Sequence, residues 1–525
     1  MPHIEIYDCT LREGEQAAGA SFSFNDRIKL FKKLDDLGVD YIELGWPIAS
    51  EDILKSFHEC EKIVKNSKIV AFGSTSIKEN PEEDKNLQSI LDSKAKFACI
   101  FGKTWLEHVS KQLNITPEEN LERIKKSINF LKENNIKVFY DAEHFFDGFL
   151  SNKEYAIKTL IEASRAGAER LILCDTNGGI FPEKAKQIVQ EVREHLDNIG
   201  IKTSLGVHFH NDRGLALASA LSCLEYIEQV QGTINGRGER IGNLNLSEFL
   251  PNYESLGFNV NIDLKKLKET VEEAFRSSGI PTPGNMPFVG KEAFAHKGGV
   301  HQDALNKGAS YEHSVPEEYG NKRIILLNTL GGTSCVVSVA RYFGHELDKK
   351  DEITKEKVEN LFKELREYEK EGYRIESLTA EQFLLVEKYF GNLKEYFNIE
   401  KWKIETSMEN NKEKSKFIVS GEIENKPFKT ELEIAGGPIN AAFKTLKGLL
   451  LEKYPEINNL HLSDYHVEIA KRSEEASTVR TSILFKCPEL FEIVGVSENI
   501  IDSSIIALCK GFKYYLNKFE KEKRI

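Results

Sequence analysis

The sequence predicts a (β/α)8 barrel in its first half, followed by mixed linker subdomains and a C-terminal α+β domain. Eight short β-rich runs alternate with amphipathic helical stretches over about 240 residues, which fits a closed barrel of parallel strands. Polar residues fall where these runs end, as they would around a barrel mouth. The pattern changes after Gly257, and we place the three parts at residues 1–262, 263–401 and 402–525. An open doubly wound sheet is the alternative for the first part.

The barrel elements follow from local composition. Runs rich in β-branched and aromatic residues predict strands at residues 4–7, 41–44, 69–72, 97–101, 137–140, 171–174, 205–209 and 229–234. Apolar residues at helical spacing predict helices between them, such as 25–37, 118–134, 153–166 and 182–198. The polar residues at or just after the ends of these strands include Asp8, Glu43, Glu143, Asp175 and His208.

The remainder of the chain reads as a crossing segment, a helical region and a duplicated unit. A proline-rich stretch at residues 281–287 predicts an irregular linker, and a charged helical region covers about 349–397. Alternating strands at 416–423 and 428–434 precede a helix at 440–452. A second set follows, with strands near 466–470 and 481–485 and a helix at 501–519. This internal repeat suggests a regulatory or oligomerising domain rather than a catalytic one.

Composition narrows the class of protein. The net charge of −12 argues against a nucleic-acid partner, which needs a basic face. No apolar stretch reaches membrane-spanning length, and the first residues lack the basic and apolar segments of a signal peptide. The eight cysteines are scattered without a CxxC pair, which is typical of free thiols in a reducing cytosol. We therefore expect a cytoplasmic protein that does not associate with membranes.

The run GVHFHND at residues 206–212 is the strongest chemical signal. Residues two apart on a strand share one face, so His208 and His210 project together. Two neutral imidazoles on one face can form half of a divalent-metal site. An isolated HxH pair is more often structural, but the following Asn211 and Asp212 favour ligation because bound histidines need an oxygen acceptor behind them.

The run DCTLREGEQ at residues 8–16 supplies the other half of the predicted site. Glu13, beside Arg12, is the expected carboxylate ligand, and Asp8 lies in the same turn. A surface loop with one ion pair is the alternative, although six ionisable or amide groups in nine residues are dense for such a loop. Two imidazoles and one carboxylate leave coordination positions open for substrate, and they suit Zn²⁺, Mn²⁺, Mg²⁺ or Co²⁺.

Further candidates surround the same mouth. The glycine-rich segment after the eighth strand would let backbone amides approach a phosphate or a nucleotide-bearing cofactor, through Gly236, Gly238, Arg240 and Gly242. Glu143 and His144 suit an acid/base pair, and Arg12 suits an oxyanion. His301 lies outside the barrel, in a glycine-containing run that suggests a mobile loop presenting a base.

These motifs together resemble the DRE-TIM metallolyase family, in its acyl-CoA-condensing branch of 2-isopropylmalate, homocitrate and citramalate synthases. The resemblance covers nearly the whole chain, and the segments at residues 45–47, 141–149 and 313–320 look most like one group of citramalate synthases. Residues 436–440 and 494–497 look like the family's allosteric domain, which senses a branched-chain amino acid.

The resemblance implies a role for each candidate. Glu13, His208 and His210 would hold the metal, with Asn243 as a further ligand. Arg12, Thr176, Asp8 and Gln16 would bind the 2-oxo acid. The catalytic set would be Arg12, Glu143, His301 and Tyr311, and the glycine-rich segment would face coenzyme A. One departure stands out, because most citramalate and isopropylmalate synthases have Asp where this chain has Glu13, and glutamate there is typical of homocitrate synthases.

The implied reaction joins acetyl-CoA to a 2-oxo acid, with pyruvate as the first choice and (R)-citramalate, in isoleucine biosynthesis, as the product. Isopropylmalate and homocitrate synthases are the close alternatives. An acyl-CoA lyase and a catalytically inactive amino-acid sensor are the alternatives from other classes. The resemblance also implies a homodimer and an amino-acid effector, with isoleucine the expected one.

Overall fold

The first part of the chain forms a closed eight-stranded parallel barrel in this computed structural model, which describes residues 4–258, 261–296, 304, 309–328, 332–348, 350–375, 378–471 and 477–523. The barrel strands follow one another in chain order, and the first pairs with the eighth to close the ring. They are β1 (Glu5–Asp8), β2 (Tyr41–Gly45), β3 (Lys68–Ser74), β4 (Phe97–Lys103), β5 (Lys137–Glu143), β6 (Arg170–Asp175), β7 (Ser204–Phe209) and β8 (Gln229–Gly232). The closed barrel is confirmed, and the open sheet is excluded.

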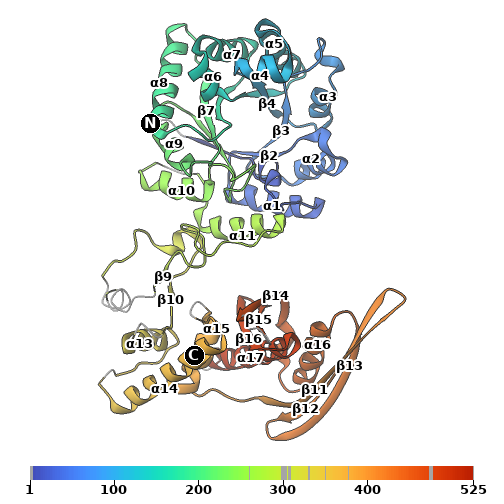
Figure 1. The fold of residues 1–525 in the computed structure, drawn as a ribbon, viewed down its shortest axis with the longest axis vertical. Helices are drawn as coiled ribbons and strands as arrows, with labels where there is room; N and C mark the ends of the chain where they lie inside the picture. Colours follow the sequence, from blue (N-terminus) through green and yellow to red (C-terminus); the bar gives the residue numbers. More distant parts are fainter. Residues whose placement is uncertain are drawn as a thin grey trace. The chain divides into compact units, whose positions relative to one another are not determined.

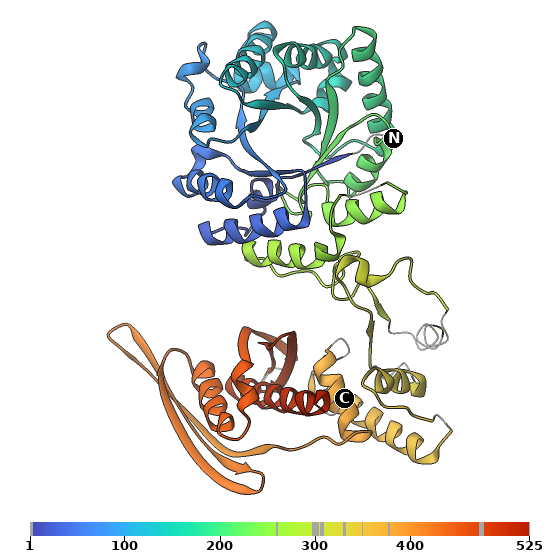
Figure 2. The same cartoon turned by 180° about the vertical axis from the view of Figure 1, so that it is seen from behind.

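Helices form an outer ring around these strands, as Figures 1 and 2 show from opposite sides. The longer ones are α1 (Phe24–Leu37), α2 (Glu51–Ile63), α3 (Lys85–Asp92), α5 (Pro117–Glu133), α7 (Lys153–Ala166), α8 (Pro182–Asn198), α10 (Leu246–Ser255) and α11 (Leu267–Ser278); α4 (Leu106–His108), α6 (Phe145–Ser151) and α9 (Ala216–Ser222) are shorter. Capping residues mark the ends of several of these helices. Thr116 and Glu119 form a capping box before α5, and Gly38 ends α1 at φ 95°.

Four strands, β3, β4, β5 and β8, end two residues or more away from the sequence prediction. β3, β4 and β5 run on to Ser74, Lys103 and Glu143, so Glu143, which was expected just after its strand, is the last residue of β5. β8 stops at Gly232 rather than residue 234. β8 ends early because the Thr233 amide donates to the carbonyl of Leu244, at 3.0 Å, and not to a neighbouring barrel strand.

The second compact unit contains residues 295–313 and 323–525. It begins with the short strands β9 (Ala295–His296) and β10 (Ile324–Ile325) and the helices α13 (Gly332–Tyr342), α14 (Glu352–Glu371) and α15 (Thr379–Tyr389). The charged helical region predicted at about 349–397 contains two helices, α14 and α15, because Gly372 ends α14 at φ 104°. None of the described helices is long and apolar enough to cross a membrane.

The C-terminal part repeats one motif, three antiparallel strands followed by a helix. The first copy is β11 (Phe397–Glu409), β12 (Lys412–Ile423), β13 (Lys426–Ala435) and α16 (Pro438–Leu451). The second is β14 (His461–Lys471), β15 (Thr478–Lys486), β16 (Leu490–Ser497) and α17 (Ile500–Glu522). The sequence indicated the repeat but placed the start of the domain at residue 402, which falls inside β11.

Candidate active site

The turn after β1 is fixed by hydrogen bonds from its own residues. The backbone carbonyl of Cys9 accepts from the amides of Arg12 and Glu13, at 3.1 and 2.8 Å. The Asp8 carboxylate accepts from the Thr10 amide and hydroxyl, at 3.0 and 2.8 Å, and is fully buried. This burial raises the pKa of Asp8 to about 7. Asp8 thus holds the turn that presents Arg12 and Glu13, while its predicted contact with substrate stays a prediction.

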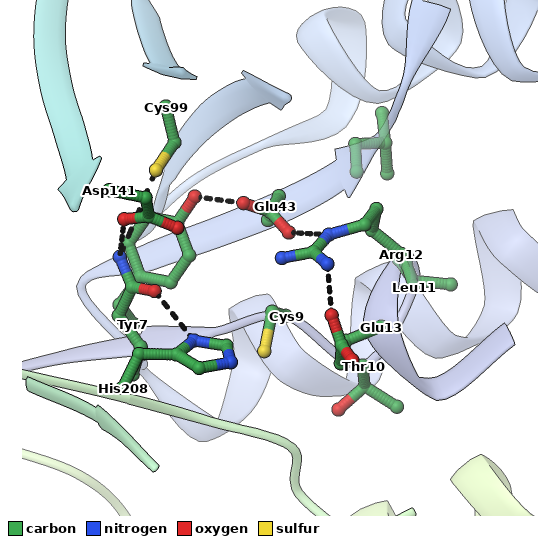
Figure 3. A network of polar contacts seen from close by, with 12 residues as sticks. Tyr7, Cys9, Thr10, Leu11, Arg12, Glu13, Glu43, Cys99, Asp141 and His208 are labelled. Carbon is green, nitrogen blue, oxygen red and sulfur yellow. Dashed lines mark hydrogen bonds and ion pairs between the residues drawn. The ribbon is translucent and has the colours of Figure 1, made fainter. Parts of the chain in front are cut away.

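Arg12 lies between two carboxylates at the barrel mouth. Its Nε donates to Glu43, and its Nη1 pairs with Glu13. Its guanidinium also lies 3.8 Å from the centre of the Phe72 ring. Tyr7 donates to the second oxygen of Glu43, so a continuous polar chain runs from Tyr7 to Glu13 (Figure 3). These contacts fix the direction in which the cation points.

The imidazole pair is held from behind by side chains inside the barrel. The rings of His208 and His210 have centroids 5.3 Å apart, as the alternation along β7 predicted. His208 Nδ1 lies 2.9 Å from Gln231 Oε1, and Gln231 Nε2 donates to Asp141 at 3.2 Å. With Nδ1 so engaged, Nε2 is the ring nitrogen of His208 that is turned toward Asn243, and a metal ligand with its other nitrogen held from behind is arranged in this way.

The predicted fourth ligand lies beside these rings. Asn243 Nδ2 is 3.0 Å from His208 Nε2, and His210 Nε2 is 3.8 Å from Glu13 Oε1. Burial lowers the pKa of His210 to about 3, so its ring is neutral at pH 7 and able to ligate. A Cβ on Gly238 would lie 1.9 Å from Asn243 Oδ1, so only glycine allows the loop to approach this closely.

The donor types suit a divalent ion, but their placement here is not that of a bound ion. As placed, no group of three His, Cys, Asp or Glu side chains in the described part of the chain could hold an ion. One oxygen of Glu13 pairs with Arg12. Neighbouring ligand atoms of one octahedral ion lie about 3 Å apart, whereas Glu13 Oε1 and His210 Nε2 are 3.8 Å apart. Two buried polar atoms here, His210 Nδ1 and Asn243 Oδ1, form no hydrogen bond with any residue that the structure describes. Turning the Asn243 amide would present its oxygen beside His208.

The glycine-rich segment folds against the rim of the barrel. Gly236 and Gly242 have φ of 69° and 112°, conformations that favour glycine. Arg240 donates to both oxygens of Asp212, at 2.7 and 2.8 Å, and to the Thr176 carbonyl at 2.8 Å. The charge of Arg240 is therefore paired with Asp212, whereas the sequence suggested an arginine available to an anion. Its role toward coenzyme A, like that of the glycines, remains a prediction.

The ends of β4, β5 and β6 are braced to one another. The Glu143 carbonyl accepts from the Thr104 amide and hydroxyl, at 3.3 and 2.6 Å. The His144 amide donates to the Thr176 hydroxyl at 2.9 Å, and the Glu143 carboxylate pairs with Lys103. Glu143 and Thr176 therefore reach the same mouth from neighbouring strands.

Three other predicted site residues stay predictions. His301 lies outside the described residues. Tyr311 belongs to the second unit and is 47% exposed, and Gln16 is exposed at the end of the short helix of residues 13–16.

Three residues that sequence reasoning did not assign to the site are Glu43, Lys103 and Gln231. The available signals were a polar residue at the end of a strand for Glu43 and Lys103, and polar residues at alternate positions of a buried strand for Gln231.

Comparisons with known proteins agree with this architecture. The family model described as HMGL-like matches residues 3–273, the homocitrate synthase post-HMGL domain-like model matches 288–371, and the LeuA allosteric (dimerisation) domain matches 378–516. The chain is 39% identical to the (R)-citramalate synthase of Aquifex aeolicus and 38% identical to that of Geobacter sulfurreducens, over 99% of both chains in each case. It is 29% identical to the 2-isopropylmalate synthase of Acetivibrio thermocellus, over 97% of this chain and 96% of that one. The chain therefore belongs to the HMGL-like family, among the members that carry a C-terminal LeuA allosteric domain.

Proposed function

We propose that this protein is a citramalate synthase, which condenses acetyl-CoA with pyruvate and releases (R)-citramalate and CoA. The observation that carries the proposal is the mouth in which Arg12, Glu13 and the imidazole pair meet, with Glu13 Oε1 3.8 Å from His210 Nε2. The full-length identity with (R)-citramalate synthases supports pyruvate as the oxo acid over the substrate of the more distant 2-isopropylmalate synthase.

The chain supplies groups for each step of such a condensation. A base removes a proton from the acetyl methyl group, the resulting carbon attacks the keto carbon of pyruvate, and water then cleaves the thioester to release CoA. A divalent ion held by Glu13, His208, His210 and Asn243 would polarise the keto group. Arg12, oriented by Glu43, is placed to stabilise the alkoxide that develops. We assign Glu143 to orienting the acetyl group and the base to His301, backed by Tyr311.

The remaining features of the proposal concern regulation and cellular setting. The LeuA allosteric domain match supports an amino-acid effector, and we propose isoleucine, the end product expected downstream of citramalate. We also propose a homodimer and a cytoplasmic location, the latter because all eight cysteines are free.

The test is a panel of 2-oxo acids assayed for free CoA, with and without a chelator. Pyruvate should give the highest kcat/KM, and chelation should stop turnover. Arg12→Gln should lower kcat/KM about 100-fold or more, by loss of oxyanion stabilisation. The control is Arg213→Gln, which removes an exposed arginine whose Nε donates to the Gly179 carbonyl at 3.0 Å, and it should not change kcat/KM. Higher kcat/KM with 2-oxoisovalerate or 2-oxoglutarate would assign a different synthase, and CoA release without any oxo acid would refute condensation. Isoleucine, added to the intact protein, should inhibit more than leucine does.

A further inference from the structure

Lys103 is a buried cation at the barrel mouth. It is the last residue of β4, and its side chain is only 8% exposed. Burying an ammonium group is costly unless an opposite charge lies beside it. Its Nζ pairs with the Glu143 carboxylate and lies 5.6 Å from the centre of the Phe101 ring. The ion pair therefore stabilises Lys103 in a position that would otherwise be unfavourable.

The same contact determines where the Glu143 carboxylate points. Lys103 and Glu143 are directly opposite each other in the register of β4 and β5. Glu143 Oε2, the oxygen that faces Lys103, is buried and makes no hydrogen bond within the described part of the chain. The ion pair with Lys103 thus acts as the directing contact for this oxygen.

The backbone at Glu143 is already fixed by other residues. Thr104 holds its carbonyl with two hydrogen bonds, and the next amide, that of His144, donates to Thr176. Only the side-chain torsions of Glu143 are left free, and they decide which way the carboxylate faces. A small displacement of a group that orients a substrate can cost about 100-fold in rate.

We propose that Lys103 is a positioning residue, which acts through Glu143 in the condensation and does not itself contact substrate. The inference rests on the proposed function, in which Glu143 orients the acetyl group. It predicts that loss of the ammonium charge impairs turnover only while the Glu143 carboxylate is present.

The test is a double-mutant cycle in the full-length protein. Lys103→Met should lower kcat about 100-fold and change KM for pyruvate less than about threefold, because the oxo-acid contacts remain. Lys103→Arg, which keeps the charge, should restore kcat to within about tenfold of wild type. Lys103→Met combined with Glu143→Gln should be no slower than Glu143→Gln alone, and this pair leaves no unpaired buried charge, so folding is preserved.

The matched control is Lys111→Met, which removes an exposed lysine from a 2.7 Å ion pair with Glu107 in the segment that follows. It should leave kcat unchanged. Near-wild-type kcat in Lys103→Met, or a further loss of the same size in the Glu143→Gln background, would overturn the positioning role. A wild-type protein that releases no CoA with any oxo acid would instead refute the proposed function, and the positioning role with it.

Discussion

Gln231 provides the sharpest test of how the imidazole pair is organised. It is fully buried in β8, accepts a hydrogen bond from His208 Nδ1 and donates one to Asp141. Gln231→Leu keeps a similar volume but removes both contacts. His208 would lose the group that fixes its ring and tautomer, and side chains of this kind typically affect metal affinity by about 10- to 100-fold. That corresponds to about 1.4–2.8 kcal/mol of binding free energy.

The same substitution should also lower stability. It leaves Nδ1 of His208 without its acceptor and removes one hydrogen-bond donor from the buried Asp141 carboxyl, at about 1–3 kcal/mol for each group. The assay is calorimetric titration of Mn²⁺ or Zn²⁺ into metal-stripped protein, with denaturant unfolding in parallel. Gln190→Leu, which removes a hydrogen bond between Gln190 and Glu194 on α8, is the control and should change neither quantity. A metal Kd within twofold of wild type in Gln231→Leu would show that Gln231 does not orient His208 for metal binding.

Three further predictions address ligation, pH dependence and the second unit. His210→Ala should abolish metal retention and turnover, and normal metal content after gel filtration would show that the ligand assignment is wrong. Burial raises the folded-state pKa of Asp8 to about 7 from an ordinary 3.8, so its contribution to stability is present below about pH 4 and lost as pH rises toward 7. Asp8→Asn should therefore reduce the loss of stability over this range, by at most about 1.4 kcal/mol per pH unit, and an unchanged slope in denaturant titrations would contradict this. Lys510→Met should destabilise the second unit by about 3–5 kcal/mol, because it removes the cation paired with Glu381, a residue that is only 1% exposed. Adding Glu381→Gln should recover much of the lost stability. Equal unfolding midpoints for the single and double variants would show that the unpaired Glu381 charge is not the cause.

The barrel could be predicted because its signals are local. Alternating β-rich and amphipathic runs specify strands and helices one at a time, and parallel strands in chain order leave few arrangements. The shared face of His208 and His210 follows from strand geometry alone. The end of β8 could not be predicted, since a hydrogen bond from Thr233 to Leu244 decides it.

The fold class, the imidazole pair and the ligand types at the strand ends follow from the sequence alone, because each depends on neighbours a few positions apart. The packed barrel is needed to show that Glu43 directs Arg12, that Gln231 supports His208, that Asp212 pairs with Arg240 and that Lys103 meets Glu143. These contacts join residues from 23 to 40 positions apart. Which side chains meet depends on how neighbouring strands and loops are placed relative to one another. Spacing along the chain gives no measure of that placement, since closure of the barrel fixes it.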